Sequence, residues 1–247
     1  MKSTERHKLK ENELARSVAA ARDVLSTRGS DITRLAIAAL VVVVIIAGYT
    51  MWRQSRNTKA QAALASGLAL FEAPVMPIAA PAPGSPLPLQ QPGTFPTEQA
   101  KYDAALPKLI EAADKYPNTD SGIAARYYAA SALASLGRFA EAEQRYQEVA
   151  QKAGSSSIYR ETARLGIGEA QLAQGKADAA MTTFKEIAAD TNSQLPVDGV
   201  LMQLGRAALV AGKKDEATRA FTRVTDEFPQ SLYVTEAKEK LAGLKKA

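Results

Sequence analysis

An unbroken apolar run lies near the start of the chain. Residues 35–52, LAIAALVVVVIIAGYTMW, carry no charge, and an arginine stands on either side of them. These eighteen residues, at about 1.5 Å each, form a helix of about 27 Å, close to a hydrocarbon core of about 30 Å. Tyr49 and Trp52, followed by Arg53 and Arg56, are typical of the edge of a membrane span. We therefore predict a transmembrane signal anchor, which is retained because no small-residue cleavage site directly follows the run.

Residues 1–34 form a charged tail with helical periodicity. Apolar positions recur near helical spacing and predict an amphipathic helix, which Gly29 should end. These positions are Leu9, Leu14, Val18, Ala21 and Leu25. The eight basic residues of the tail resist translocation, whereas a long C-terminal part crosses a membrane largely regardless of charge. We predict a cytoplasmic N-terminus and a C-terminal domain on the far side.

Beyond residue 97 the chain repeats itself. Gly137, Gly175 and Gly212 are 38 and 37 residues apart, and each precedes a charged helical segment. Around each glycine, a small residue, an alanine, a ring and an aliphatic residue recur at fixed distances. In that order they are Ala130, Gly168 and Gly205; Ala142, Ala180 and Ala217; Tyr146, Phe184 and Phe221; Val149, Ile187 and Val224. Such self-similarity indicates stacked copies of one structural unit.

The physical meaning of the repeat is a helix hairpin. The glycine breaks the chain in a tight turn, and the small residue of the first helix lets the ring of the second pack closely. One hairpin cannot bury its apolar face alone, so neighbouring copies share a core. We predict an all-α fold: a transmembrane helix, then an α-solenoid of about four helix pairs, then a polar C-terminal capping helix after Pro229.

A proline-rich stretch, 74–96, interrupts the helical sequence before the repeats. The segment that follows it, YDAALPKLIEAADKYP, has the pattern of a second repeat helix without a first, and Pro107 should kink or interrupt that helix. The upstream segment 56–73 contains Gly67 and supplies a candidate first helix. We predict a repeat domain over 53–247 whose first repeat is split by the insertion. The alternative is that the upstream segment only continues the membrane helix as a stalk.

Composition narrows the chemistry of the folded part. There is no cysteine, and the only histidine is His7 in the tail. Disulfides, thiolate metal sites and histidine-based triads are therefore excluded there. Paired carboxylates such as Glu141 and Glu143 lie on charged helical segments and are interpreted as solvated surface. We predict no enzyme, no cofactor, no metal and no small-molecule substrate.

The charge of the chain argues against nucleic acid as a partner. The formal net charge is only +5, and it is divided between the tail and the repeats. A nucleic-acid binder concentrates its basic residues on one face. Other proteins are therefore the expected partners.

The repeat landmarks resemble the tetratricopeptide repeat in a slightly lengthened form. The whole layout, a short tail, one anchor and then repeats, is similar to bacterial membrane-anchored tetratricopeptide-repeat proteins. The best-known of these form the family of the ancillary SecYEG translocon subunit (YfgM-like). This resemblance implies a periplasmic domain on the bacterial inner membrane that binds chaperones or exported proteins near the Sec translocon. The repeats also look like those of outer-membrane assembly factors, which implies the alternative of a structural scaffold for envelope assembly or cell division.

The same resemblance implies which residues meet a partner. In tetratricopeptide repeats, side chains of the first helices line the concave face of the solenoid. The matching positions here are Tyr127, Ser131, Leu165, Glu169, Met202 and Arg206. Nothing in the sequence resembles the paired lysine and asparagine residues of chaperone-binding repeats.

Overall fold

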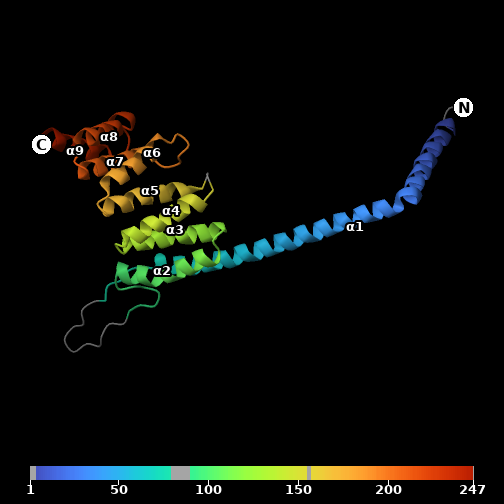
Figure 1. The fold of residues 1–247 in the computed structure, drawn as a ribbon, viewed down its shortest axis with the longest axis horizontal. Helices are drawn as coiled ribbons and strands as arrows, with labels where there is room; N and C mark the ends of the chain where they lie inside the picture. The colour runs from blue at the N-terminus through green and yellow to red at the C-terminus, as the bar shows by residue number, and fades with distance from the viewer. Residues whose placement is uncertain (1–3, 79–89, 155–156, 247) are drawn as a thin grey trace. The chain divides into compact units, whose positions relative to one another are not determined.

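The structure is a computed structural model that describes residues 4–78, 90–154 and 157–246. Within these residues the chain forms nine α-helices, α1 to α9, and one isolated β-bridge (Figure 1). The chain divides into two compact units, Met1–Ser55 and Arg56–Ala247. The all-α fold predicted from the sequence is confirmed.

Most of the first unit belongs to α1 (Thr4–Phe71), which begins there and continues into the second unit. The helix passes through Gly29 without a break, so the predicted stop at this residue is wrong. A single glycine inside a helix costs only about 1 kcal/mol relative to alanine, which the helical residues on both sides offset. The apolar side chains proposed for the tail lie outside the described residues.

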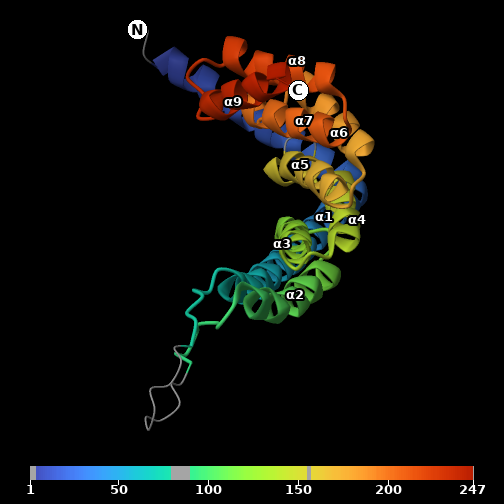
Figure 2. The ribbon, with the colours of Figure 1, turned by 90° about the vertical axis from the view of Figure 1, so that its left-hand side faces the viewer.

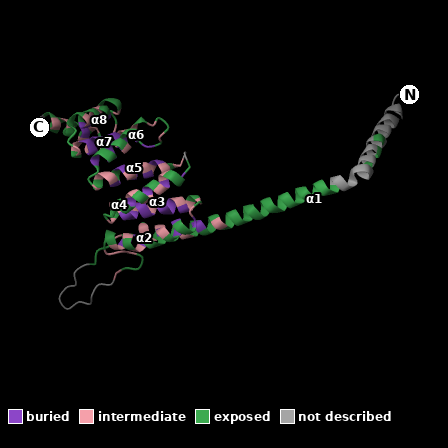
Figure 3. Ribbon diagram, in the orientation of Figure 1, coloured by how far each residue is buried: buried purple, intermediate pink, exposed green. Residues whose placement is uncertain are grey.

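The apolar part of α1 is exposed on all of its faces. Every described side chain from residue 33 to 55 is exposed, as the green ribbon of Figure 3 shows. The stretch Thr33–Phe71 is long and apolar enough to cross a membrane, by length and composition.

The second unit stacks its helices in chain order. They are α2 (Glu98–Lys115), α3 (Asp120–Ser135), α4 (Phe139–Lys152), α5 (Ile158–Ala173), α6 (Ala177–Ala189), α7 (Val197–Val210), α8 (Lys214–Glu227) and α9 (Val234–Lys246). Each of these helices packs against the next, and α5 also contacts α3 and α7. Figure 2 shows the helices of this unit following an arc, with α3, α5 and α7 on its inner side and α4 and α6 on its outer side.

Glycine makes the turn between the two helices of each later pair. Gly137, Gly175 and Gly212 have φ angles of 74°, 77° and 71°, a left-handed conformation that side chains with a Cβ disfavour. The residue after each glycine donates its backbone N–H to a carbonyl five residues back; Arg138 N lies 2.9 Å from Leu133 O. This bond satisfies a carbonyl at the helix end and fixes the direction of the next helix.

The rings of the second helices lie directly on glycines. A Cβ built on Gly168 would lie 2.5 Å from Cε1 of Phe184, and one on Gly205 would also overlap Phe221. Tyr146 instead covers Gly166 of the following repeat, where a Cβ would lie 2.7 Å from its Cε2. Close ring contact therefore requires the glycines at 168 and 205, as the repeat pattern predicts, while the glycine under Tyr146 is Gly166 and not a residue of that pattern.

The last turns of α1 pack against the helices that follow. A Cβ on Gly67 would lie 2.6 Å from Cδ2 of Leu109 in α2, a contact of the kind that Gly168 makes with its ring. The Phe71 ring lies 5.2 Å from the Tyr102 ring and 5.3 Å from the Tyr128 ring, centroid to centroid. The first buried side chain of this helix segment is Ala60, which is 1% exposed.

The proline residues affect the helices less than expected. The helix α2 runs through Pro107 without interruption, so the predicted break is absent. This proline is exposed, while its neighbours Leu106 and Leu109 remain buried.

Residues 79–89 of the proline-rich insertion lie outside the described residues. The described ends of the insertion are joined, since Met76 N donates to Phe95 O at 2.8 Å.

Candidate partner-binding face

The six residues predicted to meet a partner all belong to the inner helices α3, α5 and α7. Tyr127, Ser131, Leu165 and Arg206 are half-buried, and Glu169 is exposed. Met202 is 0% exposed and belongs to the core between α6 and α9, so it offers no surface to a partner. For Met202 the prediction of a partner-facing side chain is therefore wrong.

Tyr127 is the centre of an aromatic cluster. Its ring centroid lies 5.5 Å from that of Tyr128, 5.7 Å from that of Tyr146 and 5.5 Å from that of Tyr159. These spacings are those of favourable offset or edge-to-face aromatic pairs. Through Tyr128 the cluster continues to Phe71 and from there to Tyr102. The aromatic cluster therefore comprises Phe71, Tyr102, Tyr127, Tyr128, Tyr146 and Tyr159.

Burial affects the hydroxyl groups of three tyrosines in the aromatic cluster. Desolvation raises the pKa of Tyr127, and the same cause raises the pKa of Tyr159 and of Tyr146. The negative charge of Glu169 adds to this effect at Tyr127. Tyr146 is buried, whereas Tyr127 and Tyr159 are half-buried and offer both an apolar ring and a polar hydroxyl.

A line of polar contacts, here called the polar ladder, continues along the inner helices toward the C-terminus. Gln203 Nε2 donates to Glu169 Oε1 at 3.0 Å, which links α7 to α5. Arg206 donates to Gln203 Oε1 at 3.3 Å and, through Nη2, to both carboxylate oxygens of Glu236 in α9 at 2.8 Å. The polar ladder thus comprises Glu169, Gln203, Arg206 and Glu236, and Arg206 is not a free cation.

Glu169 stands where the aromatic cluster and the polar ladder meet. Although this side chain is exposed, the walls of the inner face exclude part of the surrounding water, and desolvation raises the pKa of its carboxyl. The hydrogen bond from Gln203 and the charge of Arg206 act in the opposite direction without cancelling the effect. A cationic or hydrogen-bonding group of a partner placed here would relieve an incompletely solvated carboxyl.

Several residues of this face escaped the sequence analysis. Tyr128 and Tyr159 occupy different positions of the repeat, so an alignment of the repeat copies does not place them in one column. The consecutive tyrosines of the segment ARYYAAS were the one available signal, because two adjacent rings on a helix cannot both enter the core. Gln203 and Glu236 become recognisable only once α5, α7 and α9 are adjacent.

The two carboxylates interpreted as solvated surface behave differently. Glu141 is exposed and accepts hydrogen bonds from Arg138 Nε and Nη2, both at 2.7 Å. Glu143 is only 13% exposed at its side chain and is structural: it accepts from Gln174 at 2.8 Å and from Gln171 and Lys176 at 3.0 Å. For Glu143 the solvated interpretation is wrong, because the next repeat folds over it. In the described part of the chain, no group of three or more His, Cys, Asp or Glu side chains is placed to hold a metal ion.

Comparison with known proteins places the fold. Residues 31–246 match a family described as tetratricopeptide repeat-like domain. A crystal structure of nearly identical TPR-like repeats, ascribed to a kinesin light chain of Podosopora anserina, has a TM-score of 0.51 and 17% identity, over 59% of this chain and 78% of that chain. A point variant of the same repeats gives a TM-score of 0.48, also at 17% identity, over 59% and 86% of the two chains. No curated protein matches the sequence.

Proposed function

We propose, because the chain belongs to the tetratricopeptide repeat-like domain family, that it is a membrane-anchored adaptor that binds other proteins through the inner face of its solenoid. The observation that carries this proposal is that Tyr127, Tyr128 and Tyr159 of the aromatic cluster and Glu169 and Gln203 of the polar ladder all belong to α3, α5 and α7, on the inner side of one arc. Tyrosine and arginine are the residues that most often dominate the energy of protein interfaces. Repeat solenoids use such extended concave surfaces for binding.

The chemistry of the face favours an extended peptide segment. Half-buried tyrosine rings offer apolar area with little loss of side-chain entropy, and their hydroxyls satisfy peptide N–H or C=O groups. The Glu169 carboxyl favours a basic or donor group at the adjoining position. The expected ligand therefore places aliphatic or aromatic side chains on the aromatic cluster and a polar residue beside Glu169.

The location we propose is the bacterial inner membrane. Residues 35–52 supply the anchor, because a helix with apolar side chains exposed on all faces is stable when hydrocarbon surrounds it. The basic tail stays in the cytoplasm and the repeats lie in the periplasm, where they assist exported proteins or chaperones near the Sec translocon. A reporter that is active only in the periplasm, fused after residue 247, should be active; activity of a cytoplasmic reporter instead would contradict this topology.

Site-directed photocrosslinking in native membranes tests the adaptor role. A photoreactive phenylalanine analogue at Tyr128 should capture partners, whereas the same analogue at exposed Glu186 on the outer helix α6 should not. Mass spectrometry of the adducts should identify translocon components, chaperones or exported chains. Recovery of cell-wall or division proteins alone would contradict the translocon role and favour the structural scaffold. Equal capture from both positions would contradict binding through the inner face.

A further inference from the structure

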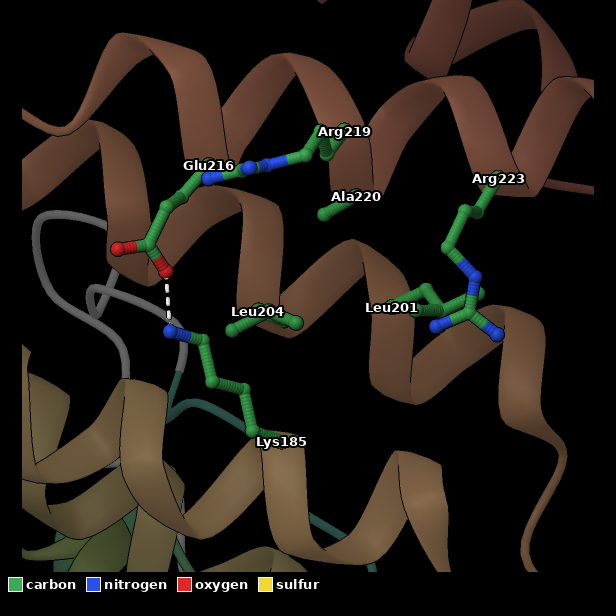
Figure 4. A pocket seen from close by; sticks show the side chains of 7 residues that line it. All are labelled: Lys185, Leu201, Leu204, Glu216, Arg219, Ala220 and Arg223. Carbon is green, nitrogen blue, oxygen red and sulfur yellow. Dashed lines mark ion pairs between the residues drawn. The ribbon is translucent and has the colours of Figure 1, made fainter.

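A hollow between α6, α7 and α8, apart from the inner face, has three basic side chains and one acidic side chain around an apolar floor. Its volume is about 340 Å³, at the lower end of the range of about 300–1,000 Å³ typical of ligand sites. Leu201, Leu204 and Ala220 form its apolar floor (Figure 4). Its rim carries Lys185, Glu216, Arg219 and Arg223, and these seven residues define the basic groove.

The cations of the basic groove differ in how firmly they are held. Lys185 rises from α6 to form an ion pair with Glu216, as the dashed line in Figure 4 marks. Arg223 reaches down from α8 beside Leu201 and pairs with exposed Glu227 of its own helix at 2.7 Å. Such a pair between exposed side chains is worth only about 0.3–0.5 kcal/mol, so an incoming anion can replace it. Arg219 makes no hydrogen bond or ion pair with any residue that the structure describes.

A second hollow extends the positive surface. It is lined by Gly212, Lys213, Lys214, Asp215, Glu216 and Arg219, and so shares two residues with the basic groove. Together the two hollows hold five cations and two carboxylates. Outside them, Asp178 pairs with Lys213 at 2.8 Å and Glu227 pairs with Arg223, so the cations without an ion pair among the described residues are Arg219 and Lys214.

We propose that the basic groove binds an acidic peptide segment of a partner protein, with carboxylates on Arg219 and Arg223 and an aliphatic side chain over the apolar floor. Charge complementarity carries this choice of occupant. The planar guanidinium groups present paired donors that match carboxylates, and the floor gives a neighbouring aliphatic residue a place to bury. Glu216 on the rim repels a dense polyanion, which favours a peptide with separated carboxylates over a nucleic acid or an anionic membrane.

The test uses the full chain in nanodiscs of zwitterionic lipid and a fluorescein-labelled peptide, ELEALEEL, followed by fluorescence anisotropy. The double variant Arg219→Gln/Arg223→Gln should bind the peptide about tenfold or more weakly, as should the wild type with the neutral probe QLQALQQL. Arg138→Gln is the matched control, because Arg138 is also an exposed arginine paired with a glutamate of the same helix segment. It should bind like the wild type.

A variant expected to bind more tightly separates a specific effect on binding from loss of binding through misfolding. Glu216→Gln removes the competing carboxylate and frees Lys185, and should tighten binding of ELEALEEL by a factor of about two to five. Photocrosslinking from Tyr128 reports on the inner face alone, so failure of the adaptor proposal and failure of this one are distinguishable.

Three outcomes would overturn the proposal. The first is unchanged affinity in the double variant, and the second is an equal loss in the Arg138→Gln control. The third is the finding that only an oligonucleotide or vesicles of anionic lipid bind in a manner sensitive to Arg219 and Arg223.

Discussion

At the scale of single residues, the contact of Phe184 with Gly168 makes a sharp stability prediction. The substitution Gly168→Ala places a Cβ 2.5 Å from a ring that is 0% exposed and cannot withdraw. Overpacking costs about 1–3 kcal/mol, and the better helix propensity of alanine returns up to about 1 kcal/mol. We expect a net loss of about 1–2 kcal/mol in the free energy of unfolding, measured by urea titration with far-UV circular dichroism in detergent.

The control for this substitution is Gly243→Ala in α9. Nothing lies within 4 Å of a Cβ built on Gly243, so the propensity gain of up to about 1 kcal/mol should appear undiminished. Equal effects of the two substitutions would show that ring contact does not determine the choice of glycine at position 168.

Glu143 makes the stability of the junction between α4 and α5 dependent on pH. Desolvation alone would raise its pKa, but hydrogen bonds from Gln174, Gln171 and Lys176 lower the pKa below its ordinary value of 4.5. Because the pKa is lower in the folded state, the carboxylate stabilises the fold above the unfolded pKa. This stabilisation is lost as the pH falls through the folded pKa. Glu143→Gln should therefore cost about 1 kcal/mol at neutral pH and lose less stability in acid than the wild type.

Salt separates this effect from that of a surface pair. Thermal unfolding is measured between pH 7 and pH 3 in 1 M salt, where the Debye length is about 3 Å. The contribution of Glu143 to stability should persist there, because its hydrogen bonds are partly shielded from solvent. The effect of Glu141→Gln, which removes an exposed partner of Arg138, should vanish in the same salt. Parallel pH curves for Glu143→Gln and the wild type would contradict the assignment.

The repeat landmarks could be predicted from the sequence because a single local structural requirement selects the residue type at each of them. A turn that needs a positive φ selects glycine at 137, 175 and 212, and a ring in the core selects a small residue opposite. The partner-face residues depend instead on helix rotation and on neighbours one repeat away. Met202 therefore entered the core, and the ion pair of Arg206 with Glu236 could not be anticipated from spacing.

At the scale of helices, we propose that residues 56–73 are the first helix of a split first repeat. The support is the contact of Gly67 with Leu109 and of Phe71 with Tyr102 and Tyr128. A stalk that merely continued a membrane helix would have no reason to carry a glycine under a leucine of α2. The proline-rich insertion 74–96 would then lie within one folding unit.

Two changes distinguish the split repeat from a stalk. Phe71→Ala should lower the free energy of unfolding of the repeats by about 2 kcal/mol, below the cost for a fully buried ring because Phe71 is half-buried. Replacement of residues 79–89 by a short Gly-Ser linker should change it by less than about 1 kcal/mol, because the ends of the insertion are already hydrogen-bonded and shortening a loop changes its closure entropy little. Ala65→Ser, on an exposed position of the same helix, is the control. A stalk predicts no loss for Phe71→Ala.

The helix breakers show where local rules fail at this scale. Gly29 and Pro107 both stand inside continuous helices, because a break costs more than the local penalty when long helical segments continue on both sides. Pro107 removes one backbone donor, and it does so on an exposed side of α2, where water can satisfy the freed carbonyl. Local residue type alone could not predict either outcome.

At the scale of the repeat unit, the buried residues form two large clusters. One extends from α2 to α5 around Leu109, Leu133 and Tyr146, and the other from α6 to α9 around Phe184 and Phe221. The helix α5 contributes to both, through buried Ala163 and half-buried Leu165. In a solenoid each repeat contacts only its neighbours, so stability is a sum of repeat and interface contributions. The two halves should therefore respond separately to a local change.

Removal of α9 tests this expectation. Truncation after residue 233 deletes buried Ala237 and the Glu236 partner of Arg206, and exposes one side of the last core cluster. Hydrogen exchange should show lost amide protection in α7 and α8, a smaller loss in α6, and none in α3 and α4, because the perturbation decays with each interface crossed. Glu236→Gln, which weakens only the ion pair, should produce a minor version of the same gradient. Uniform loss of protection from α2 to α8 would instead mean that the unit unfolds as one cooperative block, with α5 transmitting the change between the clusters.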